Sequence, residues 1–354
     1  MKKRGIKLLG IFLVCSMIVS FAACGGDKGG GDNNSGDKAA NGDKVYEWKL
    51  QNSYGPGDQT WDIQMPMIVD AIEKATDGRL KITTFQPGAI CEPEQAPQSV
   101  KEGLLDAAMS TAGDAGAIVP AAYAEQGIPF FWETSQDMFD TYYDFGLLEF
   151  LRGEYEKQNI YYGMPVPNGT YNLMTKFPVT QVSDLRGKKI RAVSSWGYFT
   201  ENLGGSPVVM PGGDIYQGLK LGTIDGTIYT FAELKNAKLG EVVTNVMEQP
   251  GSGSGFVSFL INKAKWDELP ADLQDAVNNA LKEVYTPIMR ENIKYDEEAR
   301  QAAIEEGVKI DKISDENIKA FWDAGLKTAD RVAAEHPEAK PGIEIVKKWH
   351  DEKK

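Results

Sequence analysis

Arg191 is the side chain that the sequence places best for binding chemistry. It lies within residues 184–231, where glycine and proline divide the chain into strand, helix, strand, helix and strand patterns. Residues 188–193 have the pattern of a strand, so Arg191 lies near its carboxyl end. Ligands of open α/β sheets bind at this edge, and a guanidinium group there can hold a carboxylate through two parallel hydrogen bonds. From spacing alone, however, an arginine at a strand end more often pairs with a surface carboxylate.

Groups that could carry out catalysis are few. The chain has two histidines, His336 and His350, and both lie close to its carboxyl terminus, where a surface position is the simplest interpretation. The patterns H-E-x-x-H, G-x-S-x-G, paired C-x-x-C and the calcium-binding loop do not occur in the sequence. Residues 251–255, GSGSG, lack the spacing of a phosphate-binding loop. We therefore predict a binding protein without a metal or cofactor, with an extracytoplasmic enzyme that uses an acidic pair as the alternative.

The amino terminus indicates export. Lys2, Lys3 and Arg4 precede an apolar run over residues 8–23 that is short for a membrane span, as in a secretory signal peptide. Small residues directly before Cys24 are typical of a bacterial lipobox, so we expect removal of residues 1–23 and a lipid on Cys24. Residues 24–44 have the composition of a flexible linker with a reach of roughly 25 Å. An ordinary signal peptide with an incidental cysteine is the alternative.

The charge of the chain excludes one class of partner. The sequence has 51 acidic and 38 basic residues, and its formal net charge is −13. A nucleic-acid-binding protein would have the opposite balance. The acidic balance does not argue against an anionic ligand, because salt screens the long-range field over roughly 8–10 Å and leaves a local arginine in control of a cleft.

Helix and strand patterns alternate beyond the linker, which predicts two α/β lobes. We assign residues 45–168 and 256–290 to lobe I, and residues 169–255 and 291–354, with the C-terminal helices, to lobe II. The chain is expected to cross between the lobes at Asn168 and again in the GSGSG segment.

Three helices matter for this arrangement. Residues 135–154 and 214–222 are each predicted as one helix, the second opened by a capping box of Asp214 and Gln217. Residues 271–306 favour a helix about 54 Å long, which is longer than one domain is wide. Pro287 lies in its middle and should kink it, so two helices are the alternative.

Several linked motifs in the segment around Arg191 resemble the solute-binding subunit of TRAP (tripartite ATP-independent periplasmic) transporters, the DctP family. The resemblance runs through most of residues 45–335, with landmarks at GLLDAAMS (103–110), IPFFW (128–132) and WDELPADLQDAV (266–277). The residues that match the family's ordered motifs are Asp184, Leu185, Gly187, Lys189, Ile190 and Arg191; Gly204, Gly205, Ser206, Pro207, Val208 and Met210; Asp214, Ile215, Tyr216 and Leu219; and Gly222, Ile224, Asp225 and Gly226.

The resemblance implies a fold and a function. The fold is α/β and similar to type II periplasmic binding proteins, with two lobes, a cleft between them and a long bracing helix. The function is that of a receptor, expected to be monomeric, which binds a small organic acid and delivers it to the small and large membrane permease subunits. A binding protein for a sensor kinase or an ABC-type transporter is the alternative. The resemblance also makes Arg191 the clamp for the ligand carboxylate.

Five further residues are candidates for the ligand site. Tyr171 stands where some family members have a second arginine, and Tyr229 stands where those members have an asparagine. Trp196, Thr111 and Tyr54 are weaker candidates, for which a core or rim role is as good an interpretation. One arginine without a second cation favours a monocarboxylate ligand, whereas Lys176 or Lys235 could serve a dicarboxylate.

Overall fold

The computed structural model describes residues 44–125, 128–193, 195–252 and 257–353. The expected signal peptide, Cys24 and the linker up to residue 43 lie outside these residues. Among the described helices, none combines the length and the apolar character that a membrane span requires.

The first of two mixed sheets has the strand order β2-β1-β3-β10-β4. β1 is parallel to β2 and β3, whereas β10 is antiparallel to its neighbours β3 and β4. The strands are β1 (Tyr46–Asn52), β2 (Leu80–Phe85), β3 (Ala107–Thr111), β4 (Ile160–Val166) and β10 (Val257–Asn262). Period-two alternation in β1 buries Trp48 and Leu50 in the core and exposes Glu47 and Lys49.

The second sheet has the strand order β11-β9-β5-β8-β6-β7. β6 lies between β7 and β8 and is parallel to both, while β5 is antiparallel to β8 and β9. The strands are β5 (Tyr171–Thr175), β6 (Lys189–Arg191), β7 (Ser206–Val208), β8 (Gly226–Thr230), β9 (Asn245–Ser252) and β11 (Lys309–Asp311). The chain passes from β4 of the first sheet to β5 of the second through residues 167–170, and it returns between β9 and β10.

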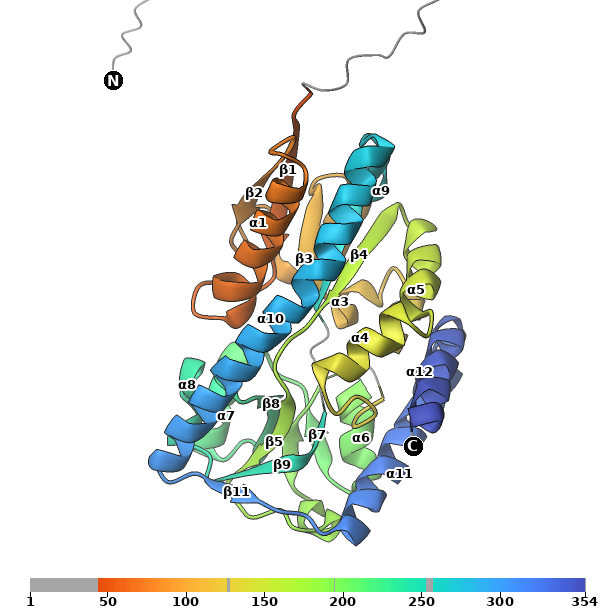
Figure 1. Ribbon diagram of the computed structural model, residues 1–354. Coiled ribbons are helices and arrows are strands. Elements are labelled where there is room, and N and C mark those ends of the chain that lie inside the picture. Colours follow the sequence, from red (N-terminus) through yellow and green to blue (C-terminus); the bar gives the residue numbers. More distant parts are fainter. Residues whose placement is uncertain (1–43, 126–127, 194, 253–256, 354) are drawn as a thin grey trace, which may run out of the picture. The chain divides into compact units, whose positions relative to one another are not determined.

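Helices pack against both sheets and join their strands (Figure 1). The α-helices are α1 (Met65–Ala75), α2 (Ala96–Glu102), α3 (Ala112–Ala115), α4 (Ser135–Tyr143), α5 (Leu147–Glu156), α6 (Ser195–Asn202), α7 (Ile215–Leu221), α8 (Ala232–Asn236), α9 (Lys263–Asp267), α10 (Ala271–Glu305), α11 (Asp315–Glu335) and α12 (Lys340–Lys353). A π-helical turn, η1 (Thr60–Gln64), leads into α1, and short 3₁₀ turns are η2 (Pro93–Gln95), η3 (Pro120–Ala124), η4 (Val182–Leu185), η5 (Gly212–Asp214), η6 (Leu239–Glu241) and η7 (Pro337–Ala339).

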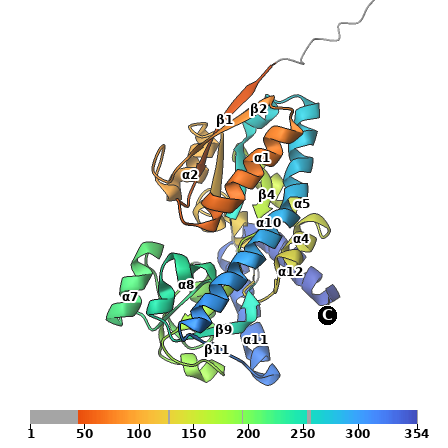
Figure 2. The ribbon, with the colours of Figure 1, turned by 60° about the vertical axis from the view of Figure 1, so that its left-hand side comes forward.

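The long helix α10 is continuous. It spans 35 residues with Pro287 inside, so the alternative of two helices is wrong. Its amino-terminal half packs beside α1 (Figure 2) and buries Leu281 and Ile288 in the core of the first sheet. Near its end Ala303 joins a core cluster of the second sheet. Proline removes one backbone hydrogen bond, and packing at both ends is sufficient to keep the helix whole.

Two local predictions differ from the structure. Residues 135–154 form two helices, because α4 ends at Tyr143 and Gly146, with a φ of 88°, interrupts the helical backbone directly before α5. The capping box before α7 is absent, since Asp214 itself has helical dihedrals in the η5 turn and its side chain makes no capping hydrogen bond.

The carboxyl-terminal helix also differs from its expected place in lobe II. α12 packs against α4, α5 and η3, which all lie on the first sheet. Its apolar residues Ile343, Val346 and Trp349 follow a three-residue spacing and are buried in that core. α11, by contrast, packs against α6 of the second sheet.

Candidate ligand-binding site

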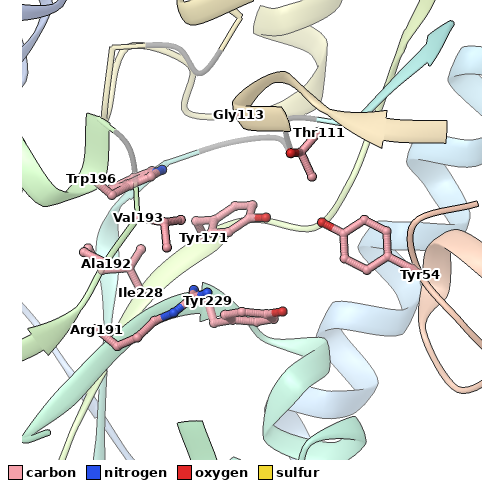
Figure 3. Close-up of a pocket in the computed structure, with 10 residues that line it drawn as sticks. All are labelled: Tyr54, Thr111, Gly113, Tyr171, Arg191, Ala192, Val193, Trp196, Ile228 and Tyr229. Atoms are coloured by element: carbon pink, nitrogen blue, oxygen red, sulfur yellow. The ribbon is translucent and has the colours of Figure 1, made fainter. Parts of the chain in front are cut away.

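A cavity of about 180 Å³ brings together all six residues that the sequence predicts for the site (Figure 3). Its lining consists of Tyr54, Thr111, Gly113, Tyr171, Arg191, Ala192, Val193, Trp196, Ile228 and Tyr229. The additional four are glycine and aliphatic residues within two positions of the predicted ones in the chain, and no motif in the sequence indicated them. Whether the six residues bind a ligand stays a prediction.

Strand ends of both sheets position these side chains. Tyr54 follows β1 and Thr111 ends β3, and these strands are parallel, so their carboxyl ends lie at one edge of the first sheet. Arg191 ends β6 in the second sheet, and Tyr229 lies near the end of the parallel strand β8. Tyr171 begins β5 and reaches the same edge because β5 is antiparallel to β8, with Tyr171 paired to Thr230.

Arg191 is held in place but has no acidic partner. Its Nε donates a hydrogen bond to the carbonyl of Met210 at 3.2 Å, and its guanidinium carbon lies 5.6 Å from the ring centroid of Tyr229. No carboxylate of the described residues forms an ion pair with it, and none of these residues accepts a hydrogen bond from its terminal nitrogens. The interpretation of Arg191 as half of a surface ion pair is therefore not supported. Its two-nitrogen edge is available for a carboxylate.

Aromatic rings form the rest of the wall. The ring centroids of Tyr171 and Trp196 are 6.1 Å apart with planes at 22°, and those of Tyr171 and Tyr229 are 6.3 Å apart. The hydroxyl groups of Tyr54 and Tyr171 point toward each other in Figure 3. Burial raises the pKa of Tyr54, Tyr171 and Tyr229 well above the usual value for a phenol, so all three remain neutral hydrogen-bond donors.

A second, smaller hollow adjoins the cavity. It has a volume of about 10 Å³ and is lined by Tyr54, Asp58, Gln59, Asn168, Tyr171, Tyr229, Thr230, Ala232 and Glu233. Asp58 precedes η1 and Glu233 lies in α8, far apart in the sequence. No local motif links them, so the sequence provided no signal for this pair. Neither histidine lines the cavity or the hollow.

The side chains that line the Arg191 cavity are suited to binding a ligand. Among the described residues, no three histidine, cysteine or acidic side chains are grouped so that they could hold a metal ion. One guanidinium group, three phenols and a tryptophan can recognise the carboxylate and the flat or apolar body of a small molecule.

Comparisons with known proteins find a family model and related chains over most of the sequence. The family model DctP, bacterial extracellular solute-binding protein, family 7, matches residues 52–336. A solute-binding protein of Chromohalobacter salexigens is 25% identical over 303 residues, which cover 82% of this chain and 86% of that protein. A monocarboxylate 2-oxoacid-binding periplasmic protein of Nostoc is 24% identical over 280 residues, which cover 77% of this chain and 75% of that one.

A solved structure shows the same fold. It is a TRAP periplasmic solute-binding protein from Desulfovibrio salexigens with bound orotic acid. The TM-score between the two structures is 0.76 and the sequence identity is 18%, and the match covers 87% of this chain and 99% of the other. The predicted α/β fold of a periplasmic binding protein, with its long helix, is thereby confirmed, and it contains two mixed sheets.

Proposed function

Because the chain belongs to the DctP family of bacterial extracellular solute-binding proteins, the solute receptors of TRAP transporters, we propose that it binds a small organic acid with one carboxylate in the Arg191 cavity. The observation that carries the proposal is the guanidinium group of Arg191, which faces a cavity and has no ion-pair partner among the described residues. The family is one of binding proteins, not enzymes.

The preference for one carboxylate follows from the cations near the cavity. Arg191 is the one lysine or arginine among the described residues that line it. Lys176 donates its Nζ hydrogen bond to the carbonyl of Leu219 at 2.9 Å, and Lys235 lies 5.7 Å from the ring centroid of Tyr295. A second buried carboxylate would therefore meet tyrosines and not a cation, which disfavours a dicarboxylate.

Volume and wall chemistry also favour a small acid. The cavity of about 180 Å³ is below the usual range of drug-sized pockets, and its aromatic faces suit an aromatic or short aliphatic body. Two similar proteins have ligands of this class of small acids. The Nostoc protein is named for binding monocarboxylate 2-oxoacids, and the Desulfovibrio salexigens structure contains orotic acid.

Ligand identification tests the proposal directly. Mass spectrometry of small molecules released from the purified protein would identify a co-purified acid. A thermal-shift screen would then compare monocarboxylates such as pyruvate and benzoate with succinate and malate. We expect the largest shift from a monocarboxylate. A much larger shift with succinate or malate would overturn the preference.

The place of action is extracytoplasmic, and we propose that a lipid on Cys24 anchors the receptor beside its small and large permease subunits. Residues 24–44 would then act as the linker between membrane and receptor. Membrane fractionation of cells that express the chain or its Cys24→Ala variant is the test. The parent should sediment with membranes, and equal solubility of both would contradict the anchor.

A further inference from the structure

The Arg191 cavity and the smaller hollow share a wall of tyrosines. Tyr54, Tyr171 and Tyr229 line both, whereas Arg191 lines the cavity and Asp58 and Glu233 line the hollow. The site thus has a cation at one end and two carboxyl groups at the other. The hollow has room for about one group the size of a water molecule.

The two carboxyl groups lack a counter-charge. Among the described residues, no lysine or arginine forms an ion pair with Asp58 or Glu233. Asp58 accepts a hydrogen bond from the backbone N–H of Thr60 at 2.7 Å, and no described residue donates a hydrogen bond to the side chain of Glu233. Burial, reinforced by Asp58 and Asp296, raises the pKa of Glu233 to about 8. At neutral pH the carboxyl group of Glu233 is therefore mostly protonated, and a positive group placed beside it would favour its ionised form.

Gln59 provides an independent indication. Its side chain lines the same hollow and is 4% exposed. The Nε2 group donates to Asp296 at 3.5 Å, but Oε1 is buried and receives no hydrogen bond from any described residue. A buried acceptor without a donor is unfavourable, so a donor is expected here when the site is filled.

We propose that the ligand is a zwitterion, whose carboxylate binds Arg191 and whose ammonium group enters the hollow between Asp58, Gln59 and Glu233. An ammonium group has three N–H donors, carries the missing positive charge and is about as large as a water molecule. The inference rests on the proposed function, since it takes the Arg191 cavity as the carboxylate site.

A bound metal ion explains the same residues less well. A calcium ion takes six to eight oxygen ligands, and the described residues contain no group of three acidic, histidine or cysteine side chains suited to a metal. A water molecule could donate to Gln59, but it would leave both carboxyl groups uncompensated. The ammonium group meets both needs.

Pairs of compounds that differ by one ammonium group test the inference. Calorimetry on the purified protein would compare alanine with propionate and phenylalanine with 3-phenylpropionate, in buffer with EDTA and with choline as the only added cation. We expect the ammonium-bearing member of a pair to bind more tightly, and Glu233→Gln to lower its affinity relative to that of the plain acid about tenfold or more. Asp58→Asn should act in the same direction.

The control is Asp70→Asn, which removes one negative charge from an exposed pair with Lys74 on α1. Asp70→Asn should change neither the affinity for the ammonium-bearing compound nor the affinity for the plain acid. Tighter binding of the plain acid in both pairs, an ammonium preference that survives Glu233→Gln, or acid binding that requires added Ca²⁺ would each overturn the inference. Failure of the proposed function would look different, because Arg191→Ala would then leave the affinity for every carboxylate unchanged.

Discussion

At the scale of single residues, Arg191 determines whether the cavity can hold an acid. Replacement by alanine should weaken binding of a monocarboxylate by roughly 2–5 kcal/mol, because the buried carboxylate loses both hydrogen bonds and its counter-charge. Arg191→Lys should restore only part of this, since an ammonium group cannot reproduce the two-nitrogen edge and would also lose the contact of Nε with Met210. Calorimetry with the best acid from the thermal-shift screen is the measurement. Unchanged affinity in a folded alanine variant would contradict the assignment.

Glu125 is a buried carboxyl group that affects stability and not binding. It accepts hydrogen bonds from Tyr155 at 2.5 Å, Tyr162 at 2.7 Å and Ser258 at 2.6 Å in the core of the first sheet. Burial outweighs these hydrogen bonds and raises its pKa from 4.5 to about 7. The folded state therefore binds this proton more tightly than the unfolded state does.

The sign of the pH dependence follows. The contribution of Glu125 to stability is fully present below about pH 4.5 and is lost as the pH rises to about 7, because the unfolded chain ionises first. Glu125→Gln cannot ionise, so the free energy of unfolding of the variant relative to the parent should rise by on the order of 3 kcal/mol across this range. Urea unfolding at several pH values measures the difference. A pH-independent difference would show that Glu125 does not titrate in this range.

The residues of the cavity were predictable to the extent that each is tied to a strand end. Arg191 and Tyr229 belong to a succession of strands and turns that can be predicted from the positions of the glycines. Asp58 and Glu233 belong to no such pattern. They share a hollow only because the loop after β1 and the helix after β8 come together in the folded chain.

At the scale of elements, the crossing from β4 to β5 is hydrogen-bonded to α10. Asn292 donates to the carbonyl of Pro167 at 2.7 Å, and the backbone N–H of Thr170 donates to Asp296 at 3.0 Å. Between them, a Cβ atom on Gly169 would lie 2.5 Å from Oδ2 of Asp296. The glycine is therefore needed because its backbone lies so close to the side chain of Asp296, and not for a left-handed turn.

Two glycine-to-alanine substitutions distinguish the effect of this contact on stability from the general effect of replacing a glycine. Gly169→Ala should lower the free energy of unfolding by roughly 1–3 kcal/mol, because the crossing or Asp296 must move. Gly153→Ala is the matched control in α5, where a Cβ atom would meet open space, and it should raise stability by roughly 0.5–1 kcal/mol. Urea unfolding followed by circular dichroism measures both. Equal stability of Gly169→Ala and the parent would contradict the proposed close packing.

Element types were more predictable than their ends and partners. The long helix was evident from its helix-favouring composition, yet Pro287 alone could not show that packing on α1 and α8 keeps it continuous. The break at Gly146 requires a backbone with positive φ, which a glycine permits but does not demand. The place of α12 depends on which core offers room for Trp349, and this is a property of the folded molecule.

At the scale of the whole molecule, strand ends of both sheets line the cavity, while the chain passes between the sheets at few points. Arg191, Tyr171 and Tyr229 come from the second sheet, and Tyr54 and Thr111 come from the first. A ligand held by both sets of residues must enter when they are apart. We therefore expect the two lobes to close when the ligand binds.

We expect bending near Asn168, in residues 251–255, of which 253–255 lie outside the described residues, and in α10 near Pro287. Small-angle X-ray scattering should give a smaller radius of gyration with a saturating monocarboxylate from the thermal-shift screen than without it. The Arg191→Ala variant with the same compound is the control and should keep the profile of the free protein, because binding and not the added solute drives closure. Identical profiles of the parent in both states, with binding shown by calorimetry, would contradict closure and indicate that the acid enters a cavity that is already formed.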